Sequence, residues 1–121
     1  MRAVQVGSRR YTEVRAIDGV GAGNANHAYE VVTVPQTSDG GSAVVATINF
    51  QNGPIKETGI NGCHNEDLIA IVIDRLQAFQ SSAYSCRENA LALTKLEESL
   101  HWLKHRTAAR QARGVEGTHA V

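Results

Sequence analysis

The chain has 121 residues, about one domain, and its 12 basic and 12 acidic side chains leave no formal net charge. A general affinity for nucleic acid or for an anionic membrane is therefore not expected, and any anion binding must come from a local cluster of charge. Two cysteines and no recognisable secretory leader indicate a soluble, cytoplasmic protein with reduced thiols. The longest apolar run, residues 68–73, is too short to span a bilayer.

The first half of the chain has the composition of β-strands. Segments rich in β-branched and aromatic residues alternate with turn formers at residues 4–6, 11–17, 29–34 and 43–50. The glycines in the stretch from Thr37 to Gly41 supply the positive φ angles that a tight hairpin turn needs. Both registers of residues 29–34 carry apolar groups, so neither sheet face is assigned to solvent. We expect an antiparallel sheet of three or four strands within residues 1–60.

Two helices are predicted within residues 61–121. The first, about residues 66–80, has Asn65 as its expected N-cap. It is apolar most of the way round, which predicts burial on two sides, by its partner helix and by the sheet or a second protomer. Its predicted stripe consists of Leu68, Val72, Leu76 and Phe79.

The second helix, about residues 86–113, is nearly twice as long as the first. A 3-4-3 spacing predicts one covered seam that runs from polar residues through leucines into a basic end. Gly114 is the expected helix stop, and the irregular tail 115–121 would fray unless docked. The predicted fold is therefore α+β, one compact unit completed by oligomerisation. The predicted seam consists of Cys86, Asn89, Leu93, Leu96, Leu100, Leu103, Thr107 and Arg110.

Three arginines, Arg106, Arg110 and Arg113, share one face at the end of the second helix, and no acid stands between Glu98 and Glu116. One interpretation is that these cations stay solvated and complement the helix dipole. The other is that their guanidinium groups form a fork suited to phosphate oxygens.

Phe79 and Asn89 also allow two interpretations. The phenylalanine at helical spacing is either a core residue or a ring with one face open to a purine, which an arginine covers from the other side. The asparagine on an apolar seam either fixes the helix register or offers its amide to a base edge or a ribose hydroxyl.

Metal binding and catalysis are not predicted. His101 and His105 are spaced to share a metal, with Cys63, His64 or Cys86 as further ligands, but the segment HWLKH lacks the glutamate of a helical zinc-protease motif. The sequence contains no glycine-rich phosphate loop and no nucleophile elbow. We therefore expect a protein that is not an enzyme and needs no cofactor.

From Gly53 to Thr118 the sequence resembles a known family. The segments NEDLIAIVIDRLQAFQ, CRENALALTKLEESLHWL and RTAARQARGVEGTH are similar to the hairpin of the Thoeris anti-defence sponges, phage proteins that sequester cyclic ADP-ribose isomers. The same hairpin occurs in the all-helical anti-CBASS cyclic-nucleotide sponge. Strands ahead of the hairpin favour the Thoeris type.

The resemblance implies that the protein binds glycocyclic ADP-ribose without cleaving it, in the cytoplasm of the infected bacterial host. It also implies a homo-oligomer, a dimer or a trimer of dimers, with the ligand between helices of two protomers. Some members of the family bind cyclic trinucleotides at a separate site, for which Lys56 and Arg113 are the candidates. The ligand contacts implied for this chain are Phe79, Asn89, Arg106 and Arg110, with Thr118 and His119 folding over the nucleotide.

Three rival functions stay open from the sequence. One is an oligomeric interaction module whose basic helix end docks an acidic protein partner. Another is a single-strand nucleic-acid binder, which zero net charge and few aromatic residues disfavour. The third is a nucleotide-cleaving enzyme, which mass spectrometry of the recovered ligand would distinguish from a sponge.

Overall fold

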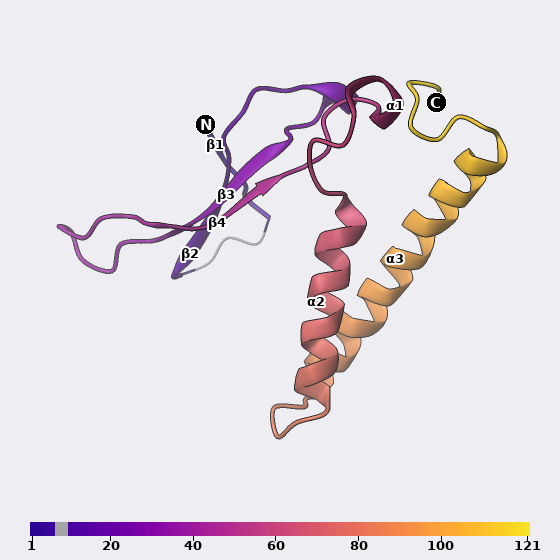
Figure 1. Cartoon of the computed structure of the whole chain (residues 1–121). Helices are drawn as coiled ribbons and strands as arrows, with labels where there is room; N and C mark the ends of the chain where they lie inside the picture. The colour runs from indigo at the N-terminus through magenta and orange to yellow at the C-terminus, as the bar shows by residue number, and fades with distance from the viewer. Residues whose placement is uncertain (7–9) are drawn as a thin grey trace. The chain divides into compact units, whose positions relative to one another are not determined.

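The computed structural model describes residues 1–6 and 10–121, and the chain divides into two compact units, Met1–Cys63 and His64–Val121. The first unit contains an antiparallel sheet and the second a helical hairpin (Figure 1). The predicted α+β fold class is therefore confirmed. Within the described ranges, no helix is both long enough and apolar enough to cross a bilayer.

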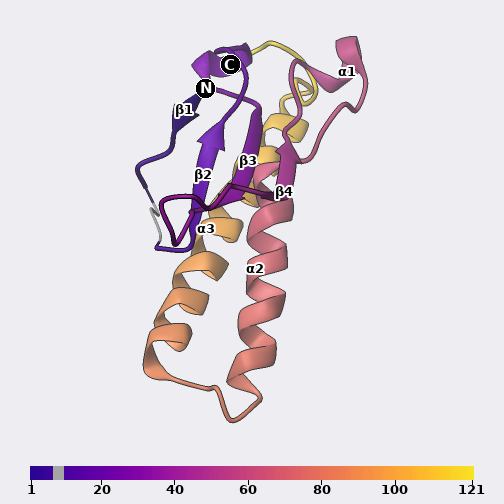
Figure 2. The same cartoon turned by 90° about the vertical axis from the view of Figure 1, so that its left-hand side faces the viewer.

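The sheet has four strands in the order β1-β2-β3-β4, and each neighbouring pair is antiparallel (Figure 2). The prediction of a first strand at residues 4–6 is wrong, because the chain leaves the sheet after pairing Arg2 with Ala16 and Ala3 with Arg15. Beyond these two pairs, the Val4 amide donates to the Val14 carbonyl at 2.9 Å. The strands are β1 (Arg2–Ala3), β2 (Thr12–Ala16), β3 (Ala28–Thr33) and β4 (Val44–Asn49).

Each face of the sheet contributes one buried residue. Ala16 pairs with Tyr29 and Glu13 pairs with Val32, so the side chains of Ala16 and Val32 point to opposite faces and both are buried. This agrees with the apolar content of both registers. The connection between β3 and β4, residues 34–43, uses no positive φ at either of its glycines. β3 and β4 form the predicted hairpin, but the expectation of positive φ angles at its glycines is wrong, because a ten-residue connection reverses the chain without them.

Two short elements lie outside the sequence prediction. A 3-10 turn, η1 (Ala22–Asn24), lies between β2 and β3, and α1 (Ile55–Thr58) follows the sheet. The side chains of Gln51 and Asn61 bridge the two ends of the segment that contains α1. Gln51 Oε1 accepts from the backbone amide of Asn61 at 2.9 Å, and Asn61 Oδ1 accepts from the backbone amide of Asn52 at 2.8 Å.

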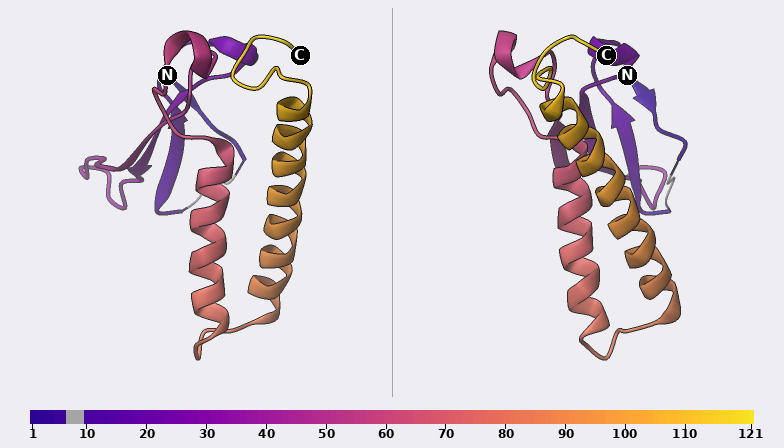
Figure 3. Two further views of the ribbon diagram at one scale, coloured as in Figure 1. Left: turned by 45° about the vertical axis from the view of Figure 1, so that its right-hand side comes forward. Right: turned by 90° about the vertical axis from the view of Figure 1, so that its right-hand side faces the viewer.

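The second unit consists of α2 (Asn65–Gln80, 16 residues) packed against α3 (Arg87–Ala112, 26 residues) (Figure 3). These bounds lie within about a residue of the predicted ones. The ten extra residues extend α3 by about 15 Å relative to α2. Asn65 is wrong as the N-cap, because extended His64 holds that place and Asp67 Oδ2 accepts from its amide at 2.8 Å.

The predicted seam of α3 is confirmed along most of its length. Its members from Asn89 to Thr107 are half-buried and Arg110 is buried, whereas Cys86, at its start, is exposed. The predicted stripe of α2 is partly wrong, because the buried residue is Ile73 while Val72 stays 43% exposed. Isoleucines and valine fill several adjacent positions of α2, so helical periodicity alone does not select the covered face.

Candidate functional site

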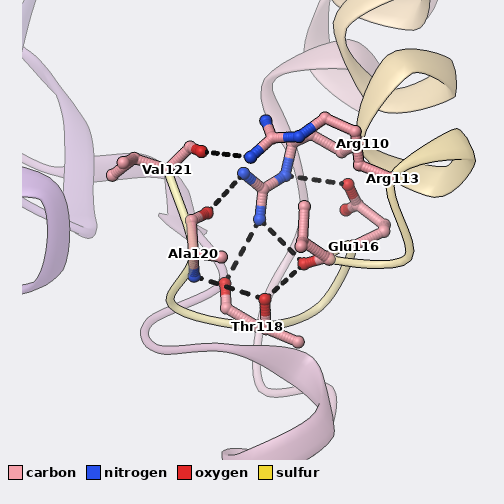
Figure 4. A network of polar contacts seen from close by, with 7 residues as sticks. Arg110, Arg113, Glu116, Thr118, Ala120 and Val121 are labelled. Carbon is pink, nitrogen blue, oxygen red and sulfur yellow. Dashed lines mark hydrogen bonds and ion pairs between the residues drawn. The ribbon is translucent and has the colours of Figure 1, made fainter.

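Arg110 is the centre of a polar network at the C-terminal end of α3 (Figure 4). The residue is 9% exposed. Nε donates to Glu116 Oε2 at 3.1 Å, and Nη1 donates to the Ala120 carbonyl at 2.6 Å. Nη2 donates to the carbonyls of Val115 at 3.0 Å and Thr118 at 3.3 Å. The guanidinium group is therefore enclosed by the chain that follows its own helix.

The tail reaches Arg110 because α3 ends in a Schellman motif at Gly114. This glycine has φ +74° and follows the helix as the predicted stop. Its amide bonds to the Gln111 carbonyl at 3.0 Å, and the Val115 amide bonds back to the Arg110 carbonyl at 3.1 Å. The Thr118 hydroxyl then donates to the Val115 carbonyl and closes the turn. The tail is thus docked on its own helix, where the sequence predicts fraying unless it docks elsewhere.

The other two arginines of this end are exposed. Arg113 Nη2 donates to the Val121 carbonyl at 2.7 Å. Arg106 forms no hydrogen bond or ion pair with any part of the chain that the structure describes. Of the three predicted arginines, Arg106 is therefore the one whose donors all remain available. His119 is exposed and lies in the same tail as Thr118.

Phe79 and Asn89 lie at the opposite end of the hairpin, beside the turn between α2 and α3. The Phe79 ring is half-buried, with the Arg75 guanidinium carbon 5.0 Å from its centroid. The Tyr84 ring makes an edge contact with it at 6.4 Å and is itself 78% exposed. The backbone amide of Asn89 donates to Cys86 Sγ at 3.5 Å, and the Asn89 side chain is half-buried.

Sequence reasoning missed Arg75, Tyr84 and Glu116. The i, i+4 spacing of Arg75 and Phe79 is a signal for their contact, since such residues are neighbours on one helix face. The glycine stop at 114 is a signal for Glu116, because a Schellman motif turns the chain back on the last helical turn. Tyr84 lies in the irregular turn, where no periodicity assigns a partner.

The predicted site residues of one hairpin thus fall into two groups. Asn89 and Arg106 are separated by 17 residues of α3, which is roughly 26 Å at about 1.5 Å per residue. A small-molecule pocket of about 300–1,000 Å³ is only about 7–10 Å across. One hairpin therefore does not bring Phe79 and Asn89 to the same small ligand as Arg106 and Arg110.

The remaining candidates come from α1 and from the second half of α3. Lys56 is exposed on α1 in the first unit. His101 and His105 form ring contacts with the exposed Trp102 between them. The described part of the chain contains no group of three or more side chains suited to hold a metal ion. Both thiols are free, with Cys63 half-buried and Cys86 exposed.

These observations define an α+β protein with a two-helix hairpin, an aromatic group at the turn and an arginine-rich far end. Residues 42–108 match the family model described as the Acb2/Tad1 hairpin domain, and the chain belongs to this family. The chain is also similar to the protein named Thoeris anti-defense 1 of Bacillus phage SBSphiJ7, with 67% identity over 75 residues.

That match covers 62% of this chain and 53% of the relative, so the chain spans about half the length of the curated relative it matches. The resemblance found in the sequence to the Thoeris anti-defence family is therefore confirmed.

Proposed function

We propose that this chain is a phage anti-defence protein that binds a cyclic ADP-ribose isomer and sequesters it without cleaving it, so that Thoeris immunity is not activated. The observation that carries the proposal is the match of residues 42–108 to the Acb2/Tad1 hairpin domain. The 67% identity to a protein named Thoeris anti-defense 1 supports the same role.

The ligand lies between two copies of the chain. The separation of roughly 26 Å between Asn89 and Arg106 supports this arrangement, because one hairpin cannot offer both ends to one nucleotide. Two hairpins that pack antiparallel bring the turn of one copy beside the arginine end of the other. Exposed apolar side chains on the helices, Ile71, Val72, Leu91 and Trp102, are available for such packing.

Within this pocket the ring of Phe79 stacks on the adenine, which contributes about 1–3 kcal/mol by analogy with other base–aromatic contacts. Arg106 forms charge-assisted hydrogen bonds to the pyrophosphate, and these are roughly twice as strong as neutral ones. The Asn89 amide contacts a base edge or a ribose hydroxyl. Stacking, hydrogen bonding and positive charge bind the ligand but do not remove a proton from it.

Arg110, Thr118 and His119 supply the wall of the pocket at the end of α3. Arg110 anchors the tail through its carbonyl contacts, and the tail carries the other two side chains. A second site for a cyclic trinucleotide, with Lys56 and Arg113 as anion contacts, is part of the proposal. Both side chains are exposed and cationic.

The test is incubation of the purified protein with a panel of cyclic ADP-ribose isomers and cyclic trinucleotides, followed by calorimetry. Heat denaturation and mass spectrometry then identify what is released. We expect at least one cyclic ADP-ribose isomer to bind and to be recovered intact. Recovery of linear ADP-ribose would indicate an enzyme, and absence of binding by every cyclic ADP-ribose isomer would refute the sponge.

The interaction module is the second candidate. It predicts no thermal shift with cyclic nucleotides, whereas a tightly bound ligand at 100 times its Kd stabilises the protein by about 2.7 kcal/mol. The ion pair between Arg110 and Glu116 reduces the charge that this end offers to an acidic partner. A thermal shift with an acidic peptide but with no nucleotide would favour the module.

A further inference from the structure

The guanidinium group of Arg110 has little capacity left for a ligand. An arginine side chain carries five N–H donors. Four of the bonds that these donors make in the described residues end on the tail, at the Glu116 carboxylate and at the carbonyls of Val115, Thr118 and Ala120. Since Nη2 makes two of these bonds, one N–H on Nη1 is left for an incoming anion.

Among the four described partners of Arg110, Glu116 is the charged acceptor, and its carboxylate lies 3.1 Å from Nε. The Arg110 side chain is 10% exposed and the Glu116 side chain 37% exposed, so water screens this pair only partly. Loss of one partner from a largely buried ion pair leaves a charge without compensation, which costs more than loss of an exposed pair. The carboxylate therefore fixes the edge of the guanidinium that carries Nε.

The three carbonyls fix the other side of the group. On the edge that Glu116 occupies, an anion that replaced it would reach only Nε, because both N–H groups of Nη2 remain directed at the Val115 and Thr118 carbonyls and one N–H of Nη1 at the Ala120 carbonyl. A bidentate contact between phosphate and Arg110 would require the tail to open. The geometry thus favours an arginine that stays within the tail while the ligand binds.

We propose that Glu116 is a positioning residue of the ligand site. It locks Arg110 in the orientation that holds the tail 115–121 closed, and this loop presents Thr118 and His119 to the nucleotide. The inference rests on the proposed function, because it assigns a role within the pocket described there. Arg106, whose donors are all available, is then the main anion contact at this end of α3.

Simple electrostatics and positioning predict opposite effects of removing this carboxylate. Loss of a negative charge close to an anion site would tighten binding of pyrophosphate through reduced repulsion. Loss of a positioning contact would weaken binding, because Arg110 and the tail become mobile. Because the lost contact is a hydrogen bond between two charged groups, we expect Glu116→Ala to raise Kd about tenfold or more.

The experiment measures Kd by calorimetry for the cyclic ADP-ribose isomer that the wild-type protein binds. Three variants are compared: Glu116→Ala, Glu116→Gln and the control Glu97→Ala. Glutamine retains an acceptor oxygen for Nε and is expected to recover most of the affinity. Glu97 is an exposed acid on α3, so its removal makes the same change in net charge at a distance from the network.

Protein labelled with 15N reports on Arg110 directly. We expect a protected Nε–H resonance in the wild type and in Glu116→Gln, and its loss in Glu116→Ala. A purely structural role of Glu116 would lower the thermal midpoint without changing Kd below it. Unchanged or tighter binding by Glu116→Ala would overturn the inference but would leave the proposed sequestering function standing. Absence of binding by the wild-type protein would instead overturn the proposed function, and this inference with it.

Discussion

A mixing experiment between two inactive variants tests whether each pocket draws on two copies of the chain. Phe79→Ala removes the ring at the turn of the hairpin, and Arg106→Ala removes the cation at its far end. Each variant alone forms pockets that all lack one contact. If the ring and the cation come from different copies, a mixed pair contains one pocket with both defects and one pocket with neither.

The expected magnitude follows from the symmetry of the pair. Random reassortment of equal amounts gives about one half mixed pairs, and one of the two pockets in each mixed pair is intact. About one quarter of all pockets should therefore bind with wild-type affinity. The roughly 26 Å between the two groups in one hairpin is the structural reason for this expectation.

The assay mixes the two variants in urea, refolds them together and measures stoichiometry by calorimetry. Phe79→Ala mixed with Asn89→Ala is the matched control, since both residues lie at the same end of the hairpin and come from the same copy. That mixture should recover no binding. No recovery in the first mixture, although the chains reassort, would refute the two-copy pocket, as would equal recovery in both mixtures.

Three further predictions concern the fold and the arginines. Gly62→Ala places a Cβ 2.5 Å from the Phe50 carbonyl oxygen and should lower the free energy of unfolding in urea by about 3 kcal/mol, whereas Gly41→Ala, with open space around its Cβ, should change it little. Equal stability of the two variants would contradict this close approach. A backbone amide hydrogen bond from His27 lowers the pKa of Asp18 below 3.8. The ionised carboxylate therefore stabilises the fold at pH above 3.8, and this contribution is lost as the pH falls through the lower pKa of the folded state. A pH series of unfolding free energies should show wild type more stable than Asp18→Asn at neutral pH, with a difference that vanishes in acid. Arg110→Ala should lower the free energy of unfolding by about 1.5–3 kcal/mol, because its hydrogen bonds to the tail are lost; the loss is no larger because the freed carbonyls regain water. Arg106→Ala should change the free energy of unfolding by no more than about 0.5 kcal/mol. The reverse order of the two variants in urea denaturation would contradict the buried network.

The sequence by itself determined the elements whose signal is local and periodic. The seam of α3 is predicted from a 3-4-3 spacing, and its positions from Asn89 to Arg110 are half-buried or buried in the structure. The glycine stop at 114, the bounds of both long helices and the antiparallel character of the sheet follow from turn formers and composition, whereas the order of the strands comes from the structure. Each of these signals depends on residues within a few positions of one another.

Tertiary structure decided the features that depend on contacts made when the chain folds back on an earlier element. Sequence identifies a basic helix end, but only the folded tail brings Glu116 and three carbonyls onto Arg110 and turns this arginine from an open cation into a buried anchor. Likewise, apolar residues on several sides of α2 leave its covered face undecided in the sequence, and only the folded structure shows that Ile73 is the buried one. The physical reason is that burial and hydrogen bonding at these positions come from partners that helical periodicity does not encode.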